Sequence, residues 1–332
     1  MSGPDRATMV TALELANRAP SVHNTQPWRW ALGTRAVHLM AAPDRRLRVA
    51  DADGRDLLLS CGAALHHLRV ALVALGWRTE VHRMPDPAEP DHLAAVEAFP
   101  RDPSTEDIAL AAAIPDRRTD RRRFSSWPVP AGHLELIARR AGEAGALLVP
   151  ATSWHSRLLL TRAIADAARR QRDQPGYAAE LAWWSGRSRV ADDGVPAANA
   201  QPGSPRHGDT TMRSFPGGAL AAVETGRGER DGGQLLVLAT LLDDPVSVLR
   251  AGEAASAALL TATDLGLATC PLSQPFEVAD TREFVRTEVL DGAAHPQLVV
   301  RTGWLPTAAP PLPPTPRRPV AQTVDELTHD RP

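Results

Sequence analysis

The sequence contains no lysine, so all 37 of its basic residues are arginines. Schiff-base enzymes, pyridoxal phosphate enzymes and P-loop nucleotidases each depend on a lysine amine, and these classes are therefore excluded. Any anion that the protein holds must be bound by guanidinium groups, backbone N–H groups or helix N-termini.

The sequence also has few cysteines, nearly balanced charges and no long apolar run. The two cysteines, Cys61 and Cys270, form no CxxC motif and adjoin no ligand-like histidine cluster, which argues against a metal and fits a reducing compartment. The net charge of -2 gives no reason to expect a nucleic-acid or membrane partner. No apolar run approaches the ~20 residues of a membrane helix, and neither a signal core nor a GxGxxG motif is present. We therefore expect a cytoplasmic protein that acts on a small molecule.

The chain alternates helical patterns with short apolar strands. Its 332 residues exceed the ~150 residues of one typical domain. Apolar periodicity predicts helices over 7–18, 57–76, 131–144, 155–172 and 245–266, and strands over 37–42, 78–83, 147–150, 234–241 and 297–303. The helices over 57–76 and 245–266 are nearly all apolar, so each should be buried on most sides. The proline-rich tail should be extended.

The two apolar helices resemble each other. GAALHHLRVALVALG at 62–76 and GEAASAALLTATDLG at 252–266 have the same length and glycines at both ends. Small residues dominate both stretches, so shared helical propensity and chance also produce such a match. A strand and a buried helix nevertheless recur in each part of the chain, which favours two similar halves packed against each other.

Four motifs are distributed over nearly the whole chain. APSVHNTQPWRW at 19–30 resembles the PSxxNxQPWxF signature of the flavin-dependent nitroreductase superfamily, and RRTDRRRF at 117–124 resembles its RRSxRxF element. LGLATCPLSQPFE at 265–277 is similar to the LGLxxxPxxGF segment that passes beside the flavin ring. PRRPV at 316–320 resembles the basic element that closes on the phosphate. The resemblance implies an α+β nitroreductase-like fold that binds FMN.

The order of the motifs resembles one branch of that superfamily. In an ordinary nitroreductase the RRSxR element precedes the PSxxN element, and each flavin lies between two subunits. Here the PSxxN element comes first, as in the fused actinobacterial NAD(P)H nitroreductases of the dormancy-associated type, where one chain imitates the dimer. The resemblance implies a first half over 1–115, a second half over 116–332 and one flavin per chain. A monomer should then form the flavin site alone, and further oligomerisation stays open.

The resemblance also implies which residues bind the cofactor. Ser21 and Asn24 would hydrogen-bond the polar edge of the flavin or its ribityl chain, while arginines grip the phosphate through charge-assisted bonds. Taken alone, RRTDRRRF also reads as a solvated basic turn, and the opening motif as a well-capped loop with Trp28 in the core. Ser273 and Gln274 depart from the acid and glycine that are frequent in the family. The implied cofactor-binding residues are Pro20, Ser21, Val22, His23, Asn24, Gln26, Arg117, Thr119, Arg121, Pro271, Leu272, Ser273, Gln274, Arg317 and Arg318.

The implied activity is an NAD(P)H-dependent oxidoreductase with ping-pong kinetics. NADH or NADPH would give a hydride to flavin N5 and leave, and a nitroaromatic, a quinone or a pathway intermediate would take the electrons. No side chain of the protein would carry the redox step, and no metal is implied. A different class of function stays open, namely a protein that stores FMN with little turnover.

An irregular segment over 175–218 bears on that choice. Glycines accumulate there, which makes a helix or strand throughout improbable. The segment also carries Trp183, Trp184 and Phe215, which a mobile polar loop has no reason to expose. We expect these aromatic residues to dock over the flavin, so that the segment acts as a lid.

Overall fold

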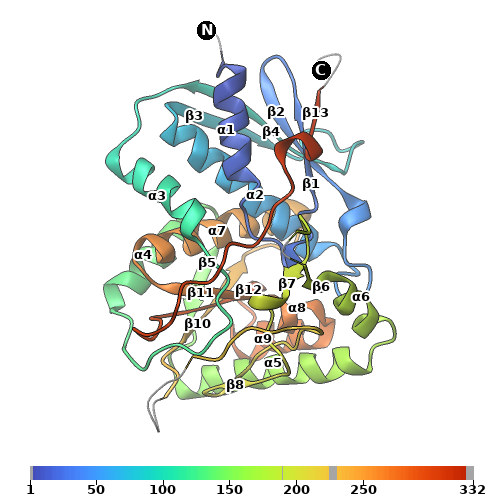
Figure 1. The fold of residues 1–332 in the computed structure, drawn as a ribbon, viewed down its shortest axis with the longest axis vertical. Coiled ribbons are helices and arrows are strands. Elements are labelled where there is room, and N and C mark those ends of the chain that lie inside the picture. Colours follow the sequence, from blue (N-terminus) through green and yellow to red (C-terminus); the bar gives the residue numbers. More distant parts are fainter. Residues whose placement is uncertain (1–2, 189, 224–229, 327–332) are drawn as a thin grey trace.

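The computed structural model describes residues 3–188, 190–223 and 230–326, which form an α+β fold around two main sheets (Figure 1). The first sheet has the strand order β13-β1-β2-β4-β3, and within it β13 and β1 pair in parallel. Helices α1 and α2 cover one of its faces. The bounds are α1 Arg6–Ala16, β1 Trp28–Leu32, β2 Ala36–Ala41, α2 Arg55–Ala74, β3 Trp77–Arg83, β4 His92–Pro100 and β13 Val324–Glu326.

Two tryptophans anchor the first sheet to the helices behind it. Strand β1 alternates inward and outward residues, so Trp28 and Trp30 are fully buried while Arg29 between them is exposed. Both indole N–H groups donate to the side-chain oxygen of Asn17, at 3.0 and 3.1 Å. Trp28 therefore lies in the core, as the alternative interpretation of the motif as a well-capped loop predicted, and the loop between α1 and β1 is fixed at both ends.

The second sheet has the order β11-β12-β10-β5 and is antiparallel. Helices α4 and α7 pack on one face, and α5, α8 and α9 pack on the other. Because both faces are covered, β10 is buried almost without alternation. The bounds are α4 Ala131–Glu143, β5 Leu147–Pro150, α5 Trp154–Asp173, β10 Gln234–Thr240, α7 Pro245–Asp264, β11 Ala268–Leu272, α8 Gln274–Glu277, α9 Ala279–Glu288 and β12 His295–Gly303.

The two nearly all-apolar helices, α2 and α7, pack against each other between the two sheets. They approach closely at Gly62 and Gly252, whose Cα atoms face each other across the contact. A Cβ added to Gly252 would come within 2.1 Å of the Leu59 carbonyl oxygen, so both glycines are required by the packing. The expectation that no apolar run approaches the length of a membrane helix is wrong for α2, which is long and apolar enough to cross a membrane, but 78% of that stretch is buried inside the protein, as in a core helix.

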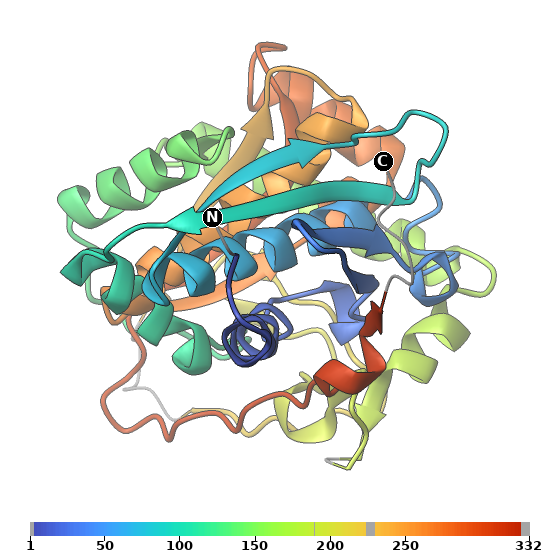
Figure 2. The ribbon, with the colours of Figure 1, turned by 90° about the horizontal axis from the view of Figure 1, so that it is seen from above.

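The tail and the irregular segment complete the structure. The proline-rich tail is extended, as predicted, and Figures 1 and 2 show it crossing from the second sheet along the outside of the molecule to β13, beside β1. The last described residues therefore belong to the first sheet, although the predicted second half includes them. The similarity of the two halves and the boundary at residue 115 stay predictions.

The segment over 175–218 is less irregular than predicted. Its described residues form a helix and four short strands, and Tyr177, Leu181 and Val195 of these elements pack against Leu47 and Ala50. Phe215 is buried there, but Trp183 is 67% exposed, so the expectation that all three aromatic residues dock inward is wrong for Trp183. An Arg187 guanidinium lies over the Trp183 ring at 5.4 Å and occupies one of its faces. The elements are α6 Tyr177–Trp184, β6 Ser185–Arg187, β7 Val195–Pro196, β8 Arg206–His207 and β9 Thr210–Thr211.

Candidate functional site

A large pocket lies where α2, α7, β11 and the loop before β1 converge. It encloses about 1180 Å³ of space, part of which is open to solvent. All of the predicted cofactor-binding residues line this pocket except Gln26 and Arg318. Residues almost 300 positions apart in the chain, Pro20 and Arg317, are therefore brought together, although no role for any of the lining residues follows from position alone. Those that line it are Pro20, Ser21, Val22, His23, Asn24, Arg117, Thr119, Arg121, Pro271, Leu272, Ser273, Gln274 and Arg317.

The loop of the opening motif is held in an unusual backbone conformation. His23, Asn24 and Gln26 all have positive φ angles, of 46°, 56° and 50°, although none is glycine. Such residues persist only where surrounding contacts fix them, and they concentrate at functional sites. Ser60 of α2 supplies one such contact, because its hydroxyl oxygen accepts from the Val22 N–H at 3.2 Å. The Asn24 amide supplies another, since it donates to the carbonyl oxygens of Gly194 and Pro316.

Gln26 and Arg318 hold this loop rather than face the pocket. The Gln26 side-chain oxygen accepts from the Arg318 N–H at 2.8 Å, and its amide donates to the Asp192 carbonyl oxygen at 2.8 Å. Gln26 is fully buried, so these bonds tie the tail and the 175–218 segment to the motif loop. Neither residue lines the large pocket, and the prediction that both bind the cofactor stays a prediction.

A cluster of four arginines closes one end of the pocket. A small adjoining pocket is lined by Arg18, Arg117, Arg118 and Arg317, together with Thr119 and Thr315. Among the residues that the structure describes, no carboxylate forms an ion pair with any of the four guanidinium groups. Nε and Nη1 of Arg117 and Nε of Arg317 are buried without hydrogen-bond partners. Unpartnered donors thus gather around a small pocket whose described lining carries no carboxylate, which is the arrangement expected for an anion site.

The pKa values of the buried arginines in this cluster also indicate an anion site. Burial, with Arg118 and Arg18 as like-charged neighbours, lowers the pKa of Arg117 to about 10. Burial and the same kind of repulsion, chiefly from Arg117, lower the pKa of Arg317 to about 9. Both groups remain charged at neutral pH, so the folded protein keeps uncompensated positive charge in a desolvated place. Arg18 and Arg118 were not predicted, although Arg18 adjoins the opening motif and Arg118 lies inside RRTDRRRF.

Arg121 occupies a different part of the pocket from this cluster. Its guanidinium lies over the Phe215 ring at 4.6 Å, and its Nη1 donates to the Asn199 carbonyl oxygen at 3.0 Å. It lines the large pocket but not the adjoining arginine pocket. Arg121 thus turns toward the 175–218 segment, and its predicted part in binding the cofactor phosphate stays a prediction.

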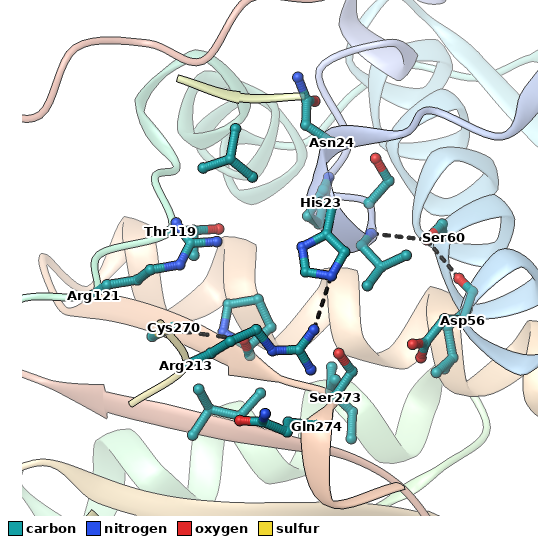
Figure 3. A pocket seen from close by; sticks show the side chains of 18 of the residues that line it. His23, Asn24, Asp56, Ser60, Thr119, Arg121, Arg213, Cys270, Ser273 and Gln274 are labelled. Atoms are coloured by element: carbon teal, nitrogen blue, oxygen red, sulfur yellow. Dashed lines mark hydrogen bonds between the residues drawn. The ribbon is translucent and has the colours of Figure 1, made fainter. Parts of the chain in front are cut away.

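Arg213 of that segment reaches into the pocket and was not predicted (Figure 3). Its Nη1 donates to Nε2 of His23 at 2.8 Å, and its Nη2 pairs with Glu277 of α8 at 2.5 Å. Burial alone would lower the pKa of Arg213, but the Glu277 carboxylate raises it above its usual range. Burial and the Arg213 charge hold the pKa of His23 well below 6.5, so its ring is neutral and accepts at Nε2.

The remaining wall of the pocket is largely apolar. Leu59 and Ala63 of α2, with Ala255 and Leu259 of α7, provide its floor, and Phe215 faces them from the 175–218 segment. Flat ligands with one charged end suit a site that is apolar along its length and cationic at one extremity. Among the described residues, no group of three or more His, Cys, Asp or Glu side chains could hold a metal ion.

Comparison with known proteins places this chain among nitroreductases. The Nitroreductase family model matches residues 114–304. A Mycobacterium tuberculosis protein with the provisional name NAD(P)H nitroreductase Rv3131 is 47% identical over 97% of this chain and 92% of its own length. The nitroreductase acg of the same organism, also provisionally named, is 37% identical over 98% of each chain. The solved structure of FMN-dependent nitroreductase NfnB from Mycobacterium smegmatis in complex with NADPH covers 65% of this chain and 96% of its own, with 16% identity and a TM-score of 0.40.

Proposed function

Because the chain belongs to the nitroreductase family, we propose that it is an FMN-dependent oxidoreductase that passes electrons from NAD(P)H to an oxidised small molecule. The observation that carries the proposal is the arginine cluster. Three buried guanidinium nitrogens of Arg117 and Arg317 have no partner, and they lie at one end of a mainly apolar pocket. A flavin mononucleotide has matching chemistry, since it joins a dianionic phosphate to a flat ring system.

The other predicted residues have roles consistent with such a ligand. The unpartnered and buried Oδ1 of Asn24 can accept a hydrogen bond from the ribityl chain or from the polar edge of the ring. Thr119 lines both pockets and can donate its hydroxyl to the phosphate. Leu59, Ala63 and Leu259 offer apolar surface to the ring, and the backbone around Ser273 would lie beside its reacting edge. We infer one FMN per chain, held without a second subunit.

Bound FMN would supply two-electron chemistry between a nicotinamide and an acceptor, and the chain would supply binding, orientation and exclusion of water. Because the nicotinamide and the acceptor would use the same side of the pocket in turn, ping-pong kinetics are expected. Nitroaromatics, quinones and pathway intermediates remain the candidate acceptors. We also propose that the protein acts in the cytoplasm.

A storage protein for FMN is the second candidate, and one observation favours it. The 175–218 segment closes one side of the pocket and is held there by Arg213, whose guanidinium bonds both His23 and Glu277. A lid fixed in this way would keep FMN bound but hinder the nicotinamide. The two candidates share the binding site and differ in turnover.

Equilibrium binding of FMN and riboflavin tests the shared part of the proposal. The purified protein should bind about one FMN per chain and bind riboflavin, which lacks the phosphate, far more weakly. Fluorescence quenching gives both affinities, and absorbance of the desalted complex gives the stoichiometry. Equal affinity for the two flavins would mean that the arginine cluster does not hold the phosphate, and failure to bind either flavin would overturn the proposal.

A further inference from the structure

Asp56 is the one carboxyl group among the described residues that line the pocket. It belongs to the first turn of α2 and is only 7% exposed. Its Oδ2 atom is buried without a hydrogen-bond partner. In Figure 3 the side chain extends from α2 toward the side of the pocket where Ser273 and Arg213 lie. A charged carboxylate is disfavoured where one of its oxygens is buried without a donor, whereas a neutral carboxylic acid is tolerated and can donate.

Two further acids lie close to Asp56, and donors already hold both. The Asp51 oxygens accept from the backbone N–H groups of Asp56 and Leu57, each at 2.9 Å. Glu277 accepts from Arg213 at 2.5 Å and from the Ser273 hydroxyl at 2.6 Å. Among these three acids, the buried and unpartnered Oδ2 of Asp56 therefore selects it as the group that carries a proton.

On balance, burial and the charged groups around Asp56 also favour its protonated form. Burial raises its pKa well above 3.8, and the Glu277 and Asp51 carboxylates raise it further. Arg213 and Arg55 oppose this effect, but Arg213 is paired with Glu277 and Arg55 bonds the Asp243 carboxylate at 3.0 Å. The helix N-terminus also favours ionisation, by a smaller amount than full burial opposes it.

The other ionisable groups of the pocket are poorer proton donors. The Nε2 atom of His23 accepts from Arg213, and the depressed pKa of the ring leaves it neutral. Burial raises the pKa of the Cys270 thiol, and its sulfur lies 3.9 Å from the Pro271 carbonyl oxygen. Arg121 and Arg213 are charged donors that do not release a proton at neutral pH.

We propose that Asp56 is a catalytic acid that protonates the acceptor as it is reduced, and a quinone illustrates the step. This inference rests on the proposed function. When a quinone receives a hydride, which carries two electrons, one of its oxygens becomes an oxyanion. The O–H bond of Asp56 breaks and a new O–H bond forms on that oxygen, which gives the hydroquinone. The Asp56 carboxylate then takes a proton from water, so each turnover consumes one NAD(P)H, one proton and one quinone.

Asp56→Asn keeps the size of the side chain and removes the acidic proton. Asp53→Asn, at an exposed acid in the turn before α2, is the matched control. The protonated carboxyl group gives a carbonyl stretch in the infrared that shifts in heavy water. We expect this band in the wild type and in Asp53→Asn near neutral pH, and we expect Asp56→Asn to lose it. Since the wild-type band is measured without any variant, poor folding of Asp56→Asn would leave this arm intact. A wild type without the band overturns the proposal.

The second arm measures reoxidation of the prereduced, FMN-loaded protein by a quinone in a stopped-flow instrument. Loss of a general acid should slow this step by about 100-fold in Asp56→Asn, with FMN affinity unchanged. The wild-type rate should fall as pH rises through the pKa of Asp56, because only the protonated acid is active, and the rate of the variant should not depend on that group. Equal rates and equal pH profiles for the wild type and Asp56→Asn would refute the catalytic role of Asp56 and leave the proposed function standing. A wild type that NADPH cannot reduce refutes the proposed function instead.

Discussion

Replacement of Arg117 by Met should separate flavin binding from stability. In the structure Arg117 has two buried donor atoms without partners, so an FMN phosphate can gain two charge-assisted bonds there. At about 1.5 kcal/mol or more for each bond, their loss should weaken FMN binding by about 100-fold or more. Riboflavin binding should hardly change, because that ligand has no phosphate.

The same substitution should stabilise the protein without flavin. The pKa of Arg117 falls from 12.5 to about 10 because burial and like-charged neighbours disfavour its charged form. At pH 7 the group is protonated in the folded and unfolded states alike, so this penalty is a cost of folding of about 3 kcal/mol. Urea unfolding of the apoprotein should therefore show a gain of up to that size.

Fluorescence titration with FMN and riboflavin measures the first effect, and urea unfolding without flavin measures the second. Arg139→Met is the matched control, because Arg139 is an exposed arginine of α4 that pairs with Glu143 on the surface. It should change neither quantity appreciably. If Arg117→Met weakens FMN and riboflavin equally, or destabilises the apoprotein, then Arg117 supports the fold and the reasoning about an anion site is refuted.

Two further predictions concern the core. Gly252→Ala should destabilise the fold by about 3 kcal/mol or prevent folding, because its Cβ would lie 2.1 Å from the Leu59 carbonyl oxygen. Urea unfolding tests this prediction. A loss of less than about 1 kcal/mol in the free energy of unfolding would contradict the close helix contact. Burial and Arg69 lower the pKa of His66 to about 3, so between that value and 6.5 the unfolded chain binds a proton that the folded chain does not, and stability falls as pH falls. Between about pH 7.5 and about pH 5, His66 should lower the free energy of unfolding of the wild type by about 2 kcal/mol, and His66→Gln should lack this contribution. Identical pH slopes for the two proteins would contradict the prediction.

The sequence predicted most of the helices and strands of the fold, and its failures have specific causes. Strand β1 was not predicted, because the first three residues of its alternating sequence WRWAL belong to the APSVHNTQPWRW motif, which reads as a loop. Helix α3, Thr105–Asp116, was also missed, although Ser104 and Asp107 form a capping box that is visible in the sequence. Where apolar periodicity was sustained, as in α2 and α7, the predicted and observed elements agree within two residues.

The sequence likewise predicted some residues of the candidate site and missed others. Residues of contiguous motifs, such as Ser21 and Asn24, line the pocket as predicted, because a short loop keeps its residues together. Arg121 also lines the pocket, but its stacking on Phe215 could not be predicted, because the two residues lie 94 positions apart in the sequence. Arg213 and Asp56 were missed because their importance arises from tertiary contacts between segments that no local pattern connects.

Anaerobic titration of the FMN-loaded protein with NADPH tests the central claim most directly, because it distinguishes an oxidoreductase from a flavin store. The proposed function predicts that the yellow absorbance of the bound flavin disappears as about one NADPH per chain is added, and that a quinone or a nitroaromatic restores it. A flavin that stays oxidised with excess NADPH, while still bound through its phosphate, would contradict the account and identify the protein as a store.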